Sequence, residues 1–126
     1  MASNSISRPK NVHFGSIPYQ ISFEELRKQQ SNDNQLSQDI DENWGCTDHA
    51  LQKIMIDNSS GSHVQRETLM HELLHCAIMW SGLAHRLSRI DPDLEEDIIQ
   101  CMSPFIFNTF TDEKNASMIK YLLLQE

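Results

Sequence analysis

The sequence predicts an α+β fold: a small antiparallel sheet from the first half of the chain, packed on a central helix that is followed by a second helix. Two observations carry this prediction. Apolar side chains alternate at period two between residues 12 and 21, which is typical of strands. After residue 62 apolar side chains recur every three or four residues, in segments flanked by residues that favour helix ends.

Composition limits the class of protein. The chain has 126 residues, enough for one domain, and a formal net charge of −8. Its ten Lys and Arg residues are scattered, so a direct nucleic-acid partner is not expected. No apolar run approaches the roughly 20 residues of a membrane span, and no secretory signal is expected. Three cysteines without CxxC spacing fit a reducing compartment, so we expect a cytoplasmic protein.

The N-terminal region predicts a hairpin. Residues 1–10 are polar and are expected to form a flexible leader, followed by a single domain over residues 11–126. Alternating apolar residues flank Gly15-Ser16, which predicts two strands joined by a tight turn. These apolar residues are Val12, Phe14, Ile17, Tyr19 and Ile21.

A short helix and a loop are expected next. Ser22 and Glu25 have the spacing of a capping box, which predicts a helix to about Gln30. The stretch from residue 29 to residue 42 is almost entirely Gln, Asn, Ser and Asp, so we expect a surface loop there.

Two further strands are predicted over residues 44–47 and 52–57, joined through Asp48-His49-Ala50. The second strand contains β-branched residues and precedes the turn-forming stretch at 58–61. We expect its free edge to pair with an extended peptide, because a strand edge offers main-chain hydrogen-bonding groups.

The central helix is predicted over residues 63–81. Ser62 and Gln65 form a capping-box pattern at its start, and Gly82 is placed to end it. A basic connection is expected after it, containing His85, Arg86 and Arg89.

Two more helices are predicted in the C-terminal third. Asp91-Pro92 is typical of a helix start, which predicts a helix over residues 92–110 that Pro104 should kink. Thr111 or Asp112 begins a last amphipathic helix, which we expect to cap the core.

The central helix carries the HExxH motif at residues 71–75. Residues four apart lie on one helix face, so His71 and His75 can present two imidazole nitrogens to one metal ion. Glu72 is placed to accept a proton from a water molecule that the ion activates. The motif therefore indicates a Zn²⁺ site with hydrolytic chemistry.

A catalytic zinc ion needs a third protein ligand from another element. The extended HExxHxxGxxH signature is absent, because Ile78 and Ser81 occupy its glycine and third histidine positions. A carboxylate on the following helix is the other common solution. The candidates from the residues alone are Glu96, Glu95 and, third, His85.

Several runs resemble one family. They are GCTD at 45–48, KIMID at 53–57, QRETLMHELLH at 65–75, EEDII at 95–99 and MSP at 102–104. Across about residues 44–110 the chain is similar to the small phage and prophage zincin-like proteins related to the ImmA/IrrE metallopeptidases. The resemblance implies a minimal zincin-like, or gluzincin-like, domain with Glu96 as the third ligand.

The resemblance also implies an endopeptidase, since better-known relatives cut a helix-turn-helix repressor at one site. The Glu-x-x-Ala-Asn-x-Phe-Ala run of longer relatives is absent here, and His49 stands where similar phage sequences usually have an aromatic residue. The resemblance therefore does not indicate which substrate this chain would cut.

Two functions follow as hypotheses. The first is a zinc-dependent peptidase that acts on a host or phage regulatory protein in the cytoplasm, with Glu72 as general base and His71, His75 and Glu96 as ligands. His85, Arg86 or Tyr19 would then stabilise the oxyanion. The second is a zinc-stabilised binding protein without turnover, for instance a phage inhibitor of a host system, because a metal can tie a small core together.

Overall fold

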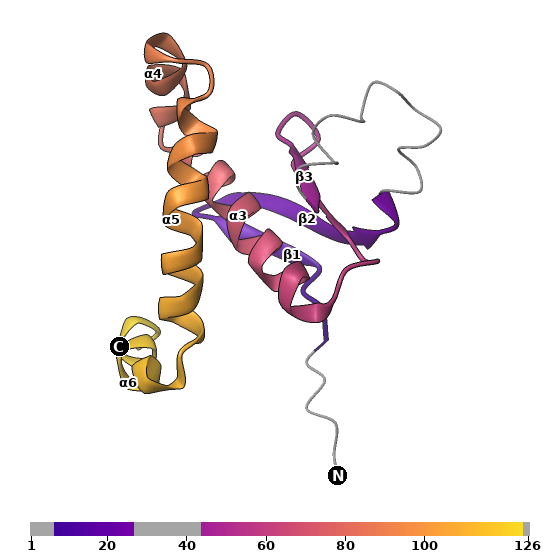
Figure 1. The fold of residues 1–126 in the computed structure, drawn as a ribbon, viewed down its shortest axis with the longest axis vertical. Coiled ribbons are helices and arrows are strands. Elements are labelled where there is room, and N and C mark those ends of the chain that lie inside the picture. The colour runs from indigo at the N-terminus through magenta and orange to yellow at the C-terminus, as the bar shows by residue number, and fades with distance from the viewer. Residues whose placement is uncertain (1–6, 27–43, 125–126) are drawn as a thin grey trace. The chain divides into compact units, whose positions relative to one another are not determined.

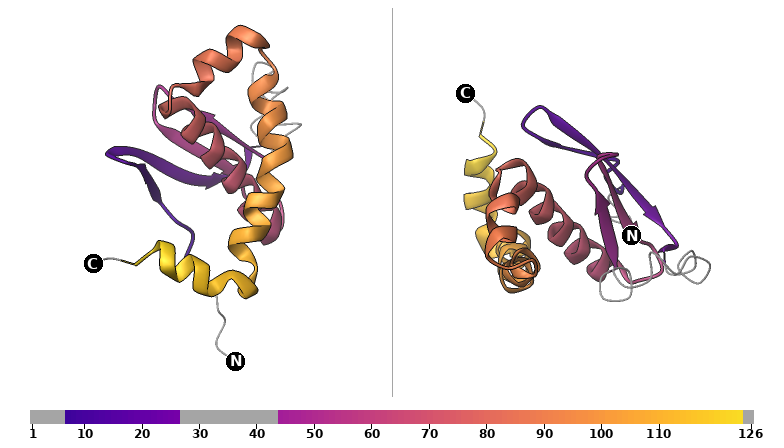
Figure 2. Two further views of the ribbon diagram at one scale, coloured as in Figure 1. Left: turned by 90° about the vertical axis from the view of Figure 1, so that its left-hand side faces the viewer. Right: turned by 90° about the horizontal axis from the view of Figure 1, so that it is seen from above.

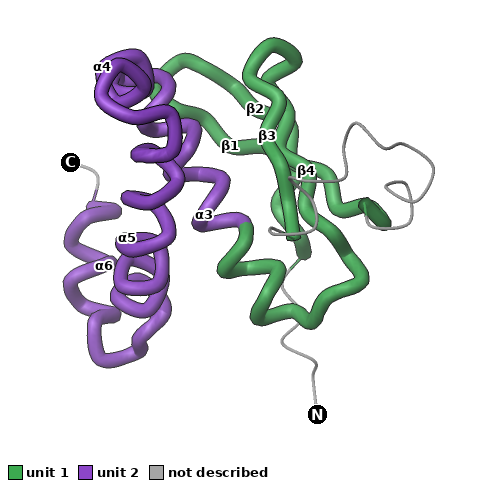
Figure 3. The backbone as a smooth tube through the Cα atoms, turned by 45° about the horizontal axis from the view of Figure 1, so that its top comes forward, with its two compact units in different colours: residues 1–68 green, residues 69–126 purple. Residues whose placement is uncertain are grey.

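The structure is a computed structural model that describes residues 7–26 and 44–124. These residues belong to two compact units, residues 1–68 and residues 69–126, and each unit is described by itself (Figure 3). The expected loop at 29–42 and the first six residues of the expected leader lie outside the described residues.

The first unit contains a mixed four-stranded sheet (Figure 1). Its strands are β1 (Asn11–Phe14), β2 (Ile17–Glu24), β3 (Gly45–Asp48) and β4 (Lys53–Asp57), in the spatial order β1-β2-β4-β3. β1 and β2 are antiparallel, as are β3 and β4, whereas β2 and β4 are parallel. The expectation of an antiparallel sheet is therefore wrong for the central pair, since β4 runs in the same direction as its neighbour β2.

The predicted hairpin around Gly15-Ser16 is confirmed. Gly15 has φ +63°, a left-handed conformation that glycine adopts without the steric cost of a Cβ. β2 is long enough to serve two partners: residues up to Gln20 pair with β1, and residues from Gln20 onward pair with β4. In Figure 2 the hairpin accordingly extends beyond the half of the sheet that β4 and β3 form.

Two expectations about these strands are wrong. The helix predicted from Ser22 to about Gln30 does not begin at Ser22, because residues 22–24 continue β2; Leu26 is helical, and residues 27–30 lie outside the described part of the chain. The Ser22 hydroxyl donates a hydrogen bond to Glu24 Oε2 at 2.6 Å. These residues are two apart in a strand and so share a face, which explains the contact without a helix cap. β4 has no free edge, because β2 and β3 pair with it on both sides. The edge strands among the described residues are β1 and β3.

The core of the first unit lies on one face of the sheet. Alternate residues of the two central strands point there, and Tyr19, Ile21, Ile54 and Ile56 are each no more than 6% exposed. Residues 62–68 of α3 (Ser62–Trp80) also belong to this unit. A Cβ built on Gly45 would lie 2.8 Å from Thr68 Cγ2, so this glycine permits a close approach of β3 and α3.

The helix α3 begins one residue earlier than predicted, at Ser62. Gln65 does reach back over the helix start, but its side-chain amide donates to the carbonyl of Ser60 at 2.6 Å. That contact replaces the expected capping box. Gly82 follows the helix with φ +82°, and its amide donates to the carbonyl of Met79, which confirms its predicted role at the helix end.

The second unit contains the rest of α3 and three further α-helices. α4 (Leu83–Ile90) occupies the segment that was expected to be a basic connection, so that expectation is wrong. α5 (Leu94–Thr111) begins two residues later than predicted, because Asp91 ends α4 and its side chain accepts from the amide of Asp93. α5 continues through Pro104 as one assigned helix.

The last elements are a 3₁₀ turn, η1 (Glu113–Asn115), and α6 (Ala116–Leu122). Asp112 caps η1 by accepting from the amide of Lys114, and the chain turns sharply between α5 and α6 (Figure 2). α6 contains no buried residue, and Leu122 is 60% exposed, so it does not cap a core as expected. None of the helices among the described residues combines the length and apolar character needed to cross a membrane.

Candidate metal centre

The HExxH motif lies in the middle of α3, within the second unit. His71 and His75 are one helical turn apart, and their ring centroids are 5.1 Å apart. Their side chains are only 13% and 19% exposed. The helix therefore presents two largely buried imidazoles on one face, as the sequence predicted.

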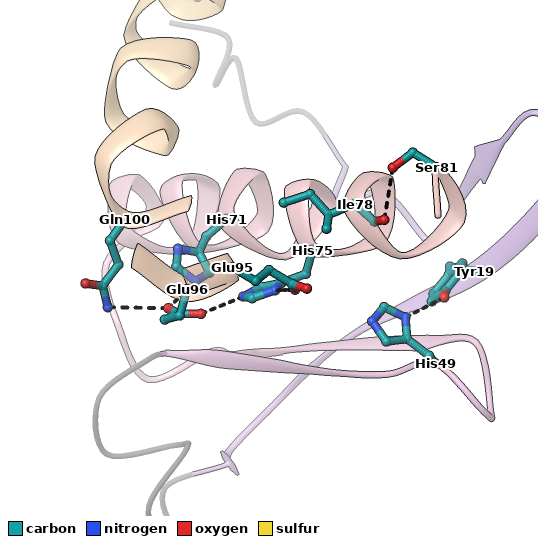
Figure 4. Close-up of polar contacts among 9 residues, drawn as sticks. All are labelled: Tyr19, His49, His71, His75, Ile78, Ser81, Glu95, Glu96 and Gln100. Atoms are coloured by element: carbon teal, nitrogen blue, oxygen red, sulfur yellow. Dashed lines mark hydrogen bonds and ion pairs between the residues drawn. The ribbon is translucent and has the colours of Figure 1, made fainter. Parts of the chain in front are cut away.

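Glu96 of α5 reaches both imidazoles with its two carboxylate oxygens (Figure 4). Its Oε1 lies 2.9 Å from His71 Nε2, and its Oε2 lies 2.8 Å from His75 Nε2. One ligand atom from each of His71, His75 and Glu96 can be chosen so that all three lie within 4.8 Å of one another. The structure thus brings together the three residues that the sequence predicted as metal ligands.

The donor atoms fit a small divalent cation. His71 Nε2 is buried and has no hydrogen-bond partner among the described residues, since its contact with Glu96 has the distance of an ion pair without hydrogen-bond geometry. A buried nitrogen without a partner is costly unless another group satisfies it. Two imidazole nitrogens and one carboxylate are a usual donor set for zinc, whose tetrahedral ligands lie about 3.3 Å apart. The spacing of the three side chains is therefore compatible with an ion among them.

Glu95, the residue before Glu96, contacts the other nitrogen of His75. Its Oε2 lies 2.5 Å from His75 Nδ1, and its side chain is 25% exposed. An ionised carboxylate can only accept, so the Nδ1–H of His75 donates this hydrogen bond. Glu95 is consequently not the third member of the cluster, although the sequence left it open as a ligand.

Carboxylates surround His75 and change its protonation. Burial acts to lower the pKa of His75, but the hydrogen bond to Glu95 and the charges of Glu72, Glu96 and Glu95 outweigh burial. The pKa of His75 is consequently raised above its usual value of 6.5. A cation that binds Nε2 of this imidazole therefore competes with a proton for that nitrogen.

Glu72 follows the first histidine on α3 and is 3% exposed. Its charge contributes to the raised pKa of His75, so its carboxylate acts electrostatically on the cluster. It does not belong to the set of three ligand atoms.

The other candidates, His85, Arg86 and Tyr19, are not members of the ligand cluster. His85 and Arg86 are exposed on α4, and His85 is not part of the ligand cluster. Tyr19 belongs to the first unit, where it is buried and its hydroxyl lies 2.7 Å from His49 Nδ1 (Figure 4).

Two contacts around the site were missed from the sequence. The first is the Glu95–His75 hydrogen bond, because residue spacing does not say which of two adjacent glutamates reaches which nitrogen. The second is Gln100, whose side-chain amide donates to Glu96 Oε1 at 3.4 Å. The spacing of four between Glu96 and Gln100 was a usable signal for that contact.

Comparison of the chain with protein-family models, curated proteins and solved structures finds no match.

Proposed function

We propose that the protein is a zinc-dependent peptidase with its active site on α3 and α5. The observation that carries this proposal is the convergence of His71, His75 and Glu96, with a buried histidine nitrogen that lacks a hydrogen-bond partner. The HExxH spacing adds a carboxylate, Glu72, beside these ligands. Together these groups are what hydrolysis by an activated water requires.

Each residue has a separate task in this proposal. His71 and His75 offer nitrogen lone pairs, and Glu96 offers a negative charge that balances the cation. A bound zinc ion supplies Lewis acidity, which makes water more nucleophilic at neutral pH and polarises a carbonyl group. Glu72 accepts the proton of the attacking water and passes it to the leaving amine nitrogen. The substrate class is a protein or peptide, such as a regulatory protein in the same cytoplasm.

A second candidate function is binding without turnover on a zinc-stabilised scaffold. Only Ile99, Ser103 and Phe107 of the 18-residue helix α5 are buried, so packing alone holds this helix weakly. A cation shared by α3 and α5 would add a strong cross-link between them. In this alternative the ligands serve stability, and Glu72 has no chemical role.

Substitution of Glu72 separates the two functions. Glu72→Gln keeps nearly the same shape but cannot accept a proton, so a peptidase should lose at least ~10²-fold in rate. We would express wild type and Glu72→Gln in bacterial cells and compare new protein N-termini by mass spectrometry. The matched control is Glu67→Gln, which removes a partly exposed acid from the same helix.

Zinc content, measured by elemental analysis on each purified protein, is the second control. The peptidase proposal expects one zinc ion per chain in all three proteins and new termini only with wild type and Glu67→Gln. A zinc-loaded Glu72→Gln protein that generates the same termini as wild type contradicts the mechanism. Partner capture by both proteins without any cleavage would favour the binding alternative.

A further inference from the structure

The two adjacent glutamates of α5 contact different nitrogens of one imidazole. Glu96 lies 2.8 Å from His75 Nε2, and Glu95 lies 2.5 Å from His75 Nδ1 (Figure 4). These nitrogens are on opposite sides of the ring. The imidazole of His75 is thus held from both sides by a single turn of α5.

A neutral imidazole carries its one proton on either Nδ1 or Nε2, and only the other nitrogen can bind a metal ion. The carboxylate of Glu95 accepts a hydrogen bond from Nδ1–H of His75 and so favours the tautomer that carries its proton on Nδ1. The lone pair is then on Nε2. This nitrogen faces Glu96, which is a member of the ligand cluster.

The environment makes the Glu95–His75 contact stronger than a surface ion pair. The two side chains are 25% and 19% exposed. By contrast, the pair His63–Glu67 on the same helix α3 is 66% and 43% exposed, with its atoms 3.0 Å apart. Water screens such an exposed pair, whereas a partly buried charge-assisted hydrogen bond fixes the ring more firmly.

We propose that Glu95 is a positioning residue of the metal centre: it holds His75 in the Nδ1–H tautomer and directs the Nε2 lone pair at a cation shared with His71 and Glu96. This inference rests on the proposed metal site, and it assigns Glu95 a role other than ligand. Carboxylate partners of this kind orient metal-binding histidines and raise their basicity. Glu96 supplies the ligand oxygen, and Glu95 supplies the orientation.

Metal affinity tests the proposal. Zinc binding would be measured by competition with a chromogenic chelator on wild type, Glu95→Ala, Glu95→Gln and Asp97→Asn. Loss of the Glu95 carboxylate should weaken binding by about 10–100-fold. Glu95→Gln should weaken it less than Glu95→Ala, because the carboxamide oxygen still accepts from Nδ1–H. Asp97 is exposed on the same helix, so Asp97→Asn controls for the loss of one negative charge and should bind nearly as wild type.

Cobalt spectra distinguish a positioning residue from a ligand. Cobalt(II) reports the number and type of its ligands through its visible absorption bands. Glu95→Gln should retain the wild-type band pattern at saturating cobalt, whereas Glu96→Gln should change it. The opposite result, with a changed spectrum in the Glu95 variant only, would make Glu95 the ligand and overturn the proposal.

The tautomer itself can be read by NMR on the zinc-loaded protein. Nitrogen-15 imidazole spectra of wild type should show His75 with a protonated Nδ1 whose proton is shifted downfield and exchanges slowly. Glu95→Ala should lose that protected proton, while circular dichroism confirms an unchanged helix content. A merely structural effect of the substitution would not move this signal selectively. Wild-type affinity together with a wild-type Nδ1–H signal in Glu95→Ala overturns the proposal.

The proposed function and this inference fail in different ways. A wild-type protein that binds no metal overturns both. A wild type that binds zinc but cleaves nothing overturns hydrolysis alone, and the affinity and NMR results then still decide the role of Glu95.

Discussion

Successive residues of an α-helix point about 100° apart, so adjacent glutamates need not do the same work. Glu96 reaches the nitrogens of both histidines, and Glu95 reaches only the far nitrogen of His75. The residue pattern alone left Glu95, Glu96 and His85 open as third ligand, because spacing along one helix does not give the crossing of two helices; Glu96 followed only from the family resemblance. The two histidines were predictable, since both belong to one helix and their spacing alone places them on one face.

At the level of single ligands, we predict that Glu96→Ala removes most zinc affinity and that His85→Ala does not. Glu96 contributes an oxygen within 2.9 Å of a ligand nitrogen, whereas His85 is exposed on α4 and outside the cluster. Losing one of three protein ligands should weaken binding by at least ~10²-fold. Isothermal titration with zinc would measure both variants. Tight binding by Glu96→Ala combined with weak binding by His85→Ala would contradict the assignment.

The raised pKa of His75 predicts opposite pH dependences for metal-free stability and for metal affinity. In the metal-free protein, the protonated imidazole contributes stability that is fully present below its unfolded pKa of 6.5 and is lost as pH rises through the folded pKa. Metal binding instead strengthens over the same window, because the cation competes with the proton at His75 Nε2. Urea unfolding with a chelator present and zinc titrations, both from about pH 6 to pH 8, would measure the two trends.

Glu95→Gln provides the control for this pH dependence. The variant removes the hydrogen-bonding charge that raises the pKa of His75, so both pH trends should move to lower pH. If the metal-free stability of wild type increases with pH between 6 and 8 and that of the variant does not, then the pKa of His75 is lowered by folding and the predicted direction of its shift is wrong.

At the scale of elements, local signals were reliable and non-local ones were not. The hairpin was predictable because its two signals, the alternation of apolar and polar residues and a glycine at the turn, lie within about ten residues of one another. The end of α3 at Gly82 was predictable for the same reason. The predicted helix start at Ser22 was wrong, because pairing of β2 with β4 extends the strand to Glu24 and overrides the local capping pattern. α4 was missed because a helix of eight residues carries few periodic positions.

Gly45 tests how closely β3 and α3 pack. A Cβ at this position would lie 2.8 Å from both Met55 O and Thr68 Cγ2, so Gly45→Ala should lower the free energy of unfolding by about 1–3 kcal/mol. Gly61→Ala is the matched control, since a Cβ there meets nothing within 4 Å. Urea unfolding would compare the two variants. Equal losses would mean that the close approach at Gly45 is not tight in solution.

A double variant identifies the atom responsible for the clash. Thr68→Ser removes Cγ2 but keeps the hydroxyl that donates to the carbonyl of Val64 at 2.7 Å. Gly45→Ala with Thr68→Ser should therefore recover part of the lost stability, with the remainder due to the backbone oxygen of Met55.

At the scale of the whole molecule, the α+β class was predictable but the strand order was not. Periodicity distinguishes strands from helices locally, whereas the parallel pairing of β2 with β4 joins segments separated by more than 25 residues. The pairing also removed the free edge expected for β4. The cluster of His71, His75 and Glu96 shows the same division, since the two histidines of α3 follow from a local motif, whereas the residue pattern alone did not select the glutamate of α5.

At the proposed metal site, a cation bound by His71 and His75 of α3 and by Glu96 of α5 would link the two helices more strongly than their direct contacts do, so its removal should destabilise the second unit. A ligand that binds the folded state alone stabilises it by about 2.7 kcal/mol when its free concentration is 100 times Kd. For a chain of this size, that corresponds to a rise of roughly 10 °C in Tm.

Differential scanning calorimetry with zinc and with a chelator would measure the shift in Tm, and Asp97→Asn should retain that shift. Glu96→Ala should show almost no zinc-dependent shift, because the cross-link to α5 is lost. An equal Tm with and without zinc in wild type would mean that no cation joins the two helices, and the partnerless nitrogen of His71 would then need another explanation.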